Sequence, residues 1–299
     1  MCIRDSNWLL ISSIALLSEL YETTGQLESL LANEAKKVAR IERYSGESSM
    51  SFHQAQLRLA LFELAFGKNF KLANTIMHRS YDQAVKTELD GTSPFHIPYL
   101  IGYADLYEKL EKLDSALYRS TEVIRLSELN YGKQSLNYLL ASSRHAEFLM
   151  AAGRYPKALL TLQEVGNALE NVNYPQQITL QKIYLILANL NRIIGEFDLS
   201  KKMLDKALTI DNRAVNKDFF VQAETSEQLA LLYLQTNNYY RAEKFATKSH
   251  SLKREKLHAS NPLFYSTYLL LAALKSSLGD LAAIEPLLEK ASTLSEEVY

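Results

Sequence analysis

The sequence predicts an all-α protein, a solenoid of about seven stacked helical hairpins. Two observations carry this prediction: one hairpin signature recurs at a fixed period, and apolar residues within each copy recur at intervals of three and four. The turn positions of the copies are Gly25, Lys68, Glu111, Gly153, Gly195, Asn237 and Gly279. Their spacings are 43, 43, 42, 42, 42 and 42 residues, which is typical of a stacked repeat array.

Four sequence columns agree with this register, and two of them consist mainly of small residues. Seven residues before each turn stand Ser18, Leu61, Ala104, Ala146, Ala188, Ala230 and Ala272. Five residues after it stand Leu30, Ala73, Ala116, Ala158, Ser200, Ala242 and Ile284. Alanine permits a short distance between helix axes, so we expect these columns to mark where helices approach closely.

Each copy reads as helix, short turn and helix. In LANLNRIIGEFDLSKKMLDKAL (187–208), apolar residues follow helical spacing on both sides of the turn glycine. Glycine suits the left-handed residue that ends a helix, and asparagine is the next best choice. Glu111 is therefore the weak copy, and we expect its turn to be strained or differently closed. We also expect Pro286 to kink the start of the last helix.

Composition agrees with a helical protein and argues against a nucleic-acid partner. Apolar residues make up 47% of the 299, and 33 Lys and Arg face 34 Asp and Glu. Binding to a phosphate backbone normally requires a basic face, which this balance does not supply. The apolar segment WLLISSIALL (8–17) is about half of the roughly 20 residues that a membrane span needs. We interpret it as the first helix of the first hairpin rather than as a signal-peptide core.

The expected boundaries follow from the register. Residues 1–6, MCIRDS, are interpreted as a translated sequencing-adapter scar, and 7–299 as a single array that is a fragment of a longer protein. Since Cys2 falls in the scar, the compartment is left open. The hairpins are predicted at roughly 8–42, 51–88, 96–130, 137–171, 178–212, 220–256 and 264–299.

Several segments resemble tetratricopeptide repeats in the 42-residue, kinesin-light-chain-like form found in bacterial scaffold and CHAT-domain proteins. The carriers are LALLYLQTNNYYRAEKF (229–245), YLILANLNRIIGEFDLSKKMLDKAL (184–208), LLLAALKSSLGDLAAIEPLLEKA (269–291) and the linker KREKLHASNPLFY (253–265). The chain departs from the light-chain pattern where paired Asn residues are replaced by Leu269 and Leu270, and by Leu185 and Ile186.

The resemblance implies a right-handed superhelix whose first helices line a concave face. Read from the register, the candidate partner-binding residues on that face are Arg58, Phe62, Phe66, Asp105, Glu108, Arg144, Glu147, Lys182, Asn189, Arg192, Glu224, Glu227 and Leu231. Further residues on the same face are Ile101, Lys109, Met150, Leu185, Leu234, Leu269 and Ala273. The balanced charges suit an extended peptide or a helix with both polar and apolar contacts.

Catalytic interpretations find little support in the residues. None of the six His lies in a helical zinc motif, and the ten Gly form no phosphate-binding loop. His145 is interpreted as a neutral core histidine. We therefore predict no catalytic, cofactor or metal site, and a scaffold that binds a protein or peptide.

Three alternatives stay open. The array could be the regulatory arm of a larger enzyme or regulator, such as a CHAT-type caspase-like peptidase, a kinase or a transcription factor, whose further domain lies beyond Tyr299. It could bind nucleic acid, which would require a basic stripe on one face. Exposed terminal hairpins could also stack on a second copy of the chain.

Overall fold

The computed structural model describes residues 16–18, 20–21, 26–66, 69–85, 91–171, 177–213, 218–259 and 261–298. Within these ranges the regular structure is helical throughout, which confirms the all-α prediction. The scar interpretation, the turns expected at Gly25 and Lys68, and most of the first helix of the first hairpin lie outside the described residues.

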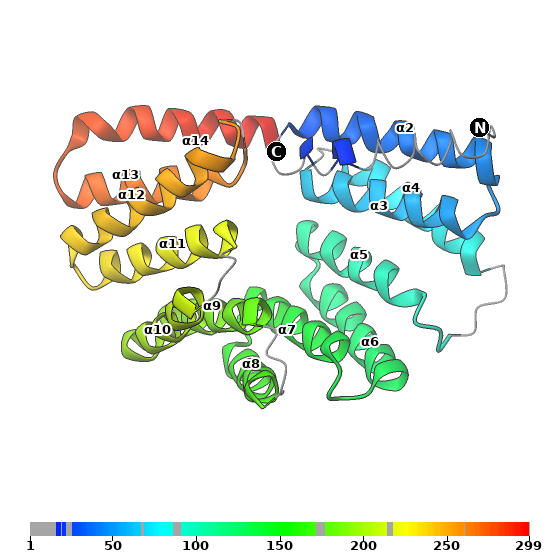
Figure 1. Cartoon of the computed structure of the whole chain (residues 1–299), viewed down its shortest axis with the longest axis horizontal. Coiled ribbons are helices and arrows are strands. Elements are labelled where there is room, and N and C mark those ends of the chain that lie inside the picture. Colours follow the sequence, from blue (N-terminus) through cyan, green and yellow to red (C-terminus); the bar gives the residue numbers. More distant parts are fainter. Residues whose placement is uncertain are drawn as a thin grey trace. The chain divides into compact units, whose positions relative to one another are not determined.

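The chain divides into two compact units, of which unit 1 comprises residues 1–133 and 298–299 and unit 2 comprises residues 134–297. Their helices are labelled in Figure 1. Unit 1 contains α2 (Leu27–Ser45), α3 (Met50–Phe66), α4 (Phe70–Val85), α5 (His96–Lys109) and α6 (Leu113–Tyr131). Unit 2 contains α7 (Leu136–Ala151), α8 (Tyr155–Glu170), α9 (Gln177–Ile193), α10 (Phe197–Arg213), α11 (Phe219–Gln235), α12 (Tyr239–Lys256), α13 (Phe264–Ser277), the 3-10 helix η1 (Leu281–Ala283) and α14 (Ile284–Val298).

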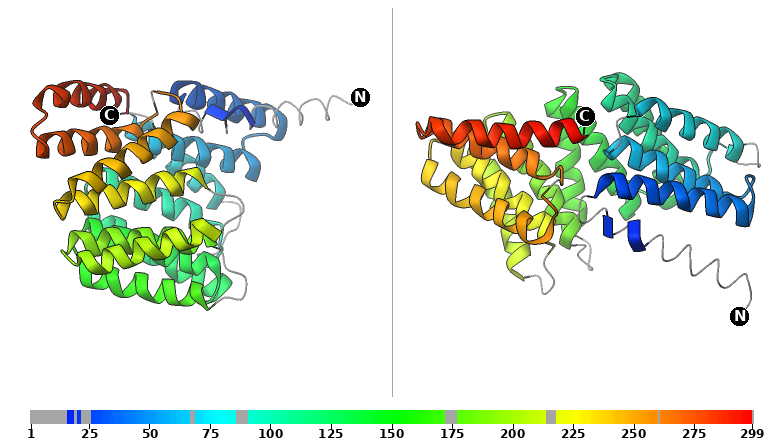
Figure 2. Two further views of the ribbon diagram at one scale, coloured as in Figure 1. Left: turned by 60° about the vertical axis from the view of Figure 1, so that its left-hand side comes forward. Right: turned by 90° about the horizontal axis from the view of Figure 1, so that it is seen from above.

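Consecutive helices within each unit pack as hairpins. In unit 2 the pairs are α7 with α8, α9 with α10, and α11 with α12, and each second helix also packs against the following first helix (Figures 1 and 2). The first helices α7, α9, α11 and α13 contact one another in succession. We call this row of four helices the first-helix layer of unit 2. Unit 1 repeats the arrangement, with α3 paired to α4 and α5 paired to α6.

The hairpin turns confirm the predicted register at every turn position that the structure describes. The backbone is left-handed at each of them, with φ of 57° at Glu111, 69° at Gly153, 87° at Gly195, 57° at Asn237 and 76° at Gly279. At Gly195 the amide donates to the carbonyl of Arg192 at 3.2 Å, and the next amide, of Glu196, donates to the carbonyl of Asn191 at 2.8 Å. The same pair of hydrogen bonds closes the other four turns. This is the Schellman cap, which satisfies carbonyls that a helix end leaves unpaired.

The small-residue columns lie where the helices cross. Before the turns, Ala104, Ala146, Ala188 and Ala230 are at most 1% exposed, and after them Ala116, Ala158, Ser200 and Ala242 are equally buried. Longer side chains at these positions would hold the paired helices apart. In these four hairpins the columns therefore set the spacing between the paired helices, as expected.

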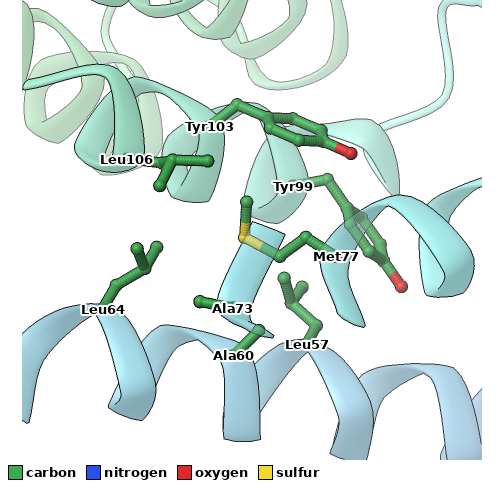
Figure 3. Packing of buried hydrophobic residues seen from close by; sticks show 8 residues of the cluster. All are labelled: Leu57, Ala60, Leu64, Ala73, Met77, Tyr99, Tyr103 and Leu106. Atoms are coloured by element: carbon green, nitrogen blue, oxygen red, sulfur yellow. The ribbon is translucent and has the colours of Figure 1, made fainter. Parts of the chain in front are cut away.

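The core of unit 1 shows how the hairpins interlock (Figure 3). Met77 of α4 lies between side chains of α3, among them Leu57 and Ala60, and the rings of Tyr99 and Tyr103 on α5. The backbone of α5 comes close at Gly102, where a Cβ would lie 3.0 Å from both Leu61 Cδ2 and Met77 Sδ. Glycine here permits a close approach that a larger residue would block.

The last hairpin departs from the others in the way that Pro286 predicts. In the preceding hairpins of unit 2 the second helix is α-helical from the second residue after the turn, whereas here a 3-10 segment, η1, precedes α14. Proline lacks the amide that an α-helix would pair with the carbonyl of Ala282, and its ring crowds that carbonyl. With α14 starting at Ile284, Pro286 falls in the first turn, where no such bond is needed.

Glu111 supports a direct test of the turn geometry. Its left-handed backbone is strained for a residue with a Cβ, so Glu111→Gly should stabilise the protein by about 1 kcal/mol. The denaturation midpoint in urea measures this gain, with Glu111→Ala as the control that removes the charge but keeps the Cβ. An equal effect of both substitutions would contradict the account.

Asn237→Gly should stabilise the protein less than Glu111→Gly does, because asparagine tolerates this conformation and Asn237 accepts a hydrogen bond from the Tyr239 hydroxyl at 3.0 Å.

Candidate functional site

The candidate partner-binding residues fall on the first helices of the hairpins, divided between the two units. In unit 1, α3 carries Arg58, Phe62 and Phe66, and α5 carries Asp105 and Glu108. In unit 2, α7 carries Arg144 and Glu147; α9 carries Lys182, Asn189 and Arg192; and α11 carries Glu224, Glu227 and Leu231. The side chain of Phe66 lies outside the described residues.

Arg58 in unit 1 is engaged by its own unit. Its guanidinium lies over the ring of Phe62 at 5.1 Å, and its Nε lies 3.5 Å from Oε1 of Glu34 on α2. Glu34 is fully buried, with Lys37 as a second cation at 3.7 Å. A buried carboxylate requires compensating charge, so Arg58 first serves the stability of unit 1.

Arg144 and Glu147 on α7 also neutralise each other. Nη1 of Arg144 lies 3.0 Å from Oε2 of Glu147, one helical turn away. The same guanidinium lies 4.5 Å from the ring centroid of Phe148. The pair is about two-thirds buried, and it presents little net charge to a partner.

Glu227 belongs to a buried network that joins three helices. Lys253 of α12 donates from Nζ to Glu227 Oε2 at 2.8 Å, to the carbonyl of Leu263 at 2.7 Å and to Thr267 Oγ1 of α13 at 2.7 Å. The Thr267 hydroxyl in turn donates to Glu227 Oε1 at 3.2 Å. All three ammonium hydrogens are thus used, which is what a buried lysine requires. The sequence reading placed Glu227 on the binding face, and the structure gives its carboxylate an internal partner.

Arg192 on α9 has a different environment. Nη2 donates to Oδ1 of Asn189 at 2.7 Å, and Nη1 donates to Oε1 of Gln235 on α11 at 3.1 Å. Both acceptors are neutral amides, and among the described residues no carboxylate forms an ion pair with this guanidinium. The side chain is half-buried, its Nε has no hydrogen-bond partner, and burial lowers the pKa of Arg192. Because the amide oxygens carry no full charge, the guanidinium is held in place without being neutralised.

Glu224 at the start of α11 is the negative counterpart. Its surface is exposed, yet the neighbouring protein displaces enough water to raise the pKa of its carboxyl. Lys182 of α9 acts in the opposite direction through its charge, while Glu227 and Glu147 add to the rise. Lys182 and Glu224 occupy the same register position on adjacent first helices, thirteen residues before the respective turns Gly195 and Asn237.

Three further expectations need correction or refinement. Leu185 is predicted on the accessible face, but it is buried. Other helices pack against α9 on both sides, so only a narrow strip of its surface stays accessible to solvent. Leu231 is half-buried against a cluster that includes Ala230, Ala246 and Leu270. His145 is half-buried rather than fully buried, and burial followed by the charge of Arg154 lowers its pKa, which agrees with a neutral imidazole.

Sequence reasoning missed Lys253 and Gln235. Lys253 lies sixteen residues after its turn, in a column that Ser127, Leu169 and Asp211 occupy in earlier repeats. All four are buried, so a lysine in this column could have indicated an internal ion pair. Nothing in the pattern pointed to Gln235, whose role depends on the spacing between α9 and α11.

The described residues show no cluster suited to a metal ion. They contain no group of three or more His, Cys, Asp or Glu side chains placed to hold a metal ion. A search for membrane spans among the described helices finds none that is long and apolar enough.

Comparisons with known proteins agree with this fold. A family profile described as tetratricopeptide repeat matches residues 181–213. A search of the curated proteins finds no match to this sequence.

Three solved structures illustrate the likeness. A putative kinesin light chain from Podospora anserina with nearly identical TPR-like repeats has 17% identity, a TM-score of 0.55, and coverage of 68% of this chain and 95% of its own. A tetratricopeptide repeat protein from Parabacteroides merdae has 15% identity, a TM-score of 0.57, and coverage of 96% and 97%. A signal transduction ATPase from Pyrococcus horikoshii with a tetratricopeptide repeat sensor has 14% identity, a TM-score of 0.57, and coverage of 95% and 47%. At these identities the likeness shows a shared fold.

The Lys253 network predicts a large local effect of one substitution. Lys253→Met would leave the carboxylate of Glu227 buried without its cation, and should destabilise α11–α13 by about 3–5 kcal/mol. Hydrogen–deuterium exchange measures this loss as faster exchange of the amides in these helices. Lys201→Met, which removes an exposed pair with Asp205 at 2.9 Å, is the matched control and should change exchange little. Unchanged protection of these amides in Lys253→Met would show that the network does not stabilise the contacts between α11, α12 and α13.

Proposed function

We propose that the chain is a tetratricopeptide-repeat protein and that it works by binding a protein or peptide partner on the first-helix layer of unit 2. Tetratricopeptide-repeat folds typically serve as protein-interaction scaffolds. The observation that supports this particular surface is its charge: Lys182, Arg192 and Glu224 form no direct ion pair with another described side chain. Elsewhere on the same layer, charged groups such as Arg144 and Glu147 are neutralised internally.

The mechanism is geometric. Stacked hairpins with fixed turns and buried alanine columns form a rigid support, so the surface itself loses little conformational freedom when a partner docks. Most of the conformational entropy is lost by the partner segment, and its contacts along several successive helices offset this loss. No step requires a proton transfer or a covalent bond.

A peptide-display selection against the full chain tests this proposal. Enriched peptides should bind wild type, and Glu224→Lys should weaken their binding by about tenfold, because it reverses an exposed charge on the layer without breaking a direct contact. Lys201→Glu on α10, a second helix, is the control and should leave affinity within about twofold. Failure to enrich any binder, or equal loss in both variants, would count against the proposed surface.

The alternative is a regulatory arm of a larger enzyme or regulator. The Pyrococcus horikoshii protein favours it, because there a tetratricopeptide repeat sensor belongs to a signal transduction ATPase. Recovery of the reading frame beyond Tyr299 discriminates the two: a peptidase, kinase or transcription-factor domain would make the repeats a sensing arm. The same docking surface would then act as the input of that protein.

Self-association through α14 stays a prediction. Leu281 and Leu288 are 73% and 45% exposed, and they line a shallow depression with Ile284, Glu285, Glu289 and Ser292. The residues equivalent to Leu288 in α8, α10 and α12 are Leu162, Leu204 and Ala246, all buried. Sedimentation equilibrium should show a dimer for wild type that Leu288→Gln weakens, whereas a monomeric wild type would contradict self-association.

A further inference from the structure

The first-helix layer of unit 2 carries charge at two separate places. Arg192 lies near the end of α9, three residues before its turn, and Glu224 lies near the start of α11, thirteen residues before its turn. Since α9 and α11 pack side by side, this register difference of ten residues separates the two groups by about 15 Å along the helix axes. Their placement on neighbouring helices adds about 9 Å across the layer.

Arg192 is preorganised to receive an anion. Asn189 and Gln235 accept from its two terminal nitrogens, which fixes the plane of the guanidinium. Its charge has no carboxylate partner among the described residues, and Nε has no acceptor. In a half-buried setting a guanidinium gains more from a carboxylate than it would in open solvent, because less water screens the pair.

Glu224 offers an exposed carboxylate to a cation. Its side chain is exposed and forms no ion pair with another described side chain, although Lys182 of α9 acts on it through its charge, so a ligand ammonium or guanidinium can reach the carboxylate directly. Of its carboxylate neighbours, Glu227 is already bound to Lys253, and Glu147 is bound to Arg144. Glu224 therefore remains the carboxylate at this end that a partner can address.

Resting on the proposed function, we infer that the partner is an extended peptide that carries an acidic side chain for Arg192 and a basic side chain for Glu224. The two groups lie about 17 Å apart when the axial and lateral offsets are combined. An extended strand advances about 3.3 Å per residue, so the acidic and basic residues should stand about five positions apart. This spacing is the signature by which the partner can be recognised.

The test uses peptides enriched by display on the full chain, resynthesised with single changes. Enriched sequences should contain Asp or Glu and Lys or Arg about five positions apart, in one order along the peptide. Replacing the acidic residue with Gln or Asn should weaken binding about tenfold, as should Arg192→Gln, and the two changes together should lose little more than either alone. Calorimetry measures each affinity.

Reversing the charge of Arg192 gives a more stringent test of the same inference. Arg192→Glu should reject the acidic peptide and bind its Lys-substituted counterpart at least tenfold better than wild type does. Arg241→Gln on α12 is the matched control, because its guanidinium also lies against a side chain, the ring of Tyr233 at 5.4 Å, but on a second helix. It should leave both peptides unaffected, and far-UV circular dichroism checks that each variant is folded.

The outcomes separate this inference from the proposed function. If no peptide binds wild type, the proposed function itself is overturned. If peptides bind and Glu224→Lys weakens them, but removal of the acidic residue or of Arg192 changes nothing, the layer is a docking surface and the charge-spacing inference is wrong. Random spacing of charges among the enriched peptides would overturn it equally.

Discussion

The left-handed turn at the end of α5, α7, α9, α11 and α13 is the constraint on which the remaining structure depends. A single residue with positive φ, closed by the same two backbone hydrogen bonds, reverses the chain at five described positions. Because the turns recur at a nearly constant interval, each hairpin presents the same column to its neighbour. This register determines the positions of the buried alanines, of the row of first helices and of the charged residues on that row.

The same register explains why most charges on the first-helix layer of unit 2 are structural and a few are not. Some charged side chains form a pair with an opposite charge on their own helix or the next one, as Arg144 with Glu147 and Lys253 with Glu227 do. Arg192 meets only the amides of Asn189 and Gln235, so its charge stays uncompensated. The proposed interaction surface consists of the positions at which internal pairing fails.

Sequence periodicity was sufficient for the helices, the turns and the buried columns, because these depend on local backbone preferences and residue size. Pro286 even indicated the irregular start of the last helix. The contacts of individual side chains could not be predicted from periodicity, because they depend on the distances between helices. Lys253 donates to Leu263 and Thr267 on the next hairpin, and Leu185 is buried by the helices on both sides of α9. The sequence therefore predicts which helices carry the candidate residues, while the state of each charge on them required the structure.

Hydrogen–deuterium exchange of the full chain, with and without a display-selected peptide, tests the central claim most directly. The account predicts slower exchange in α9 and α11, whose first-helix surfaces carry Arg192 and Glu224, with α10 and α12 little changed. Slower exchange confined to the second helices would place the partner on the opposite side and contradict the account.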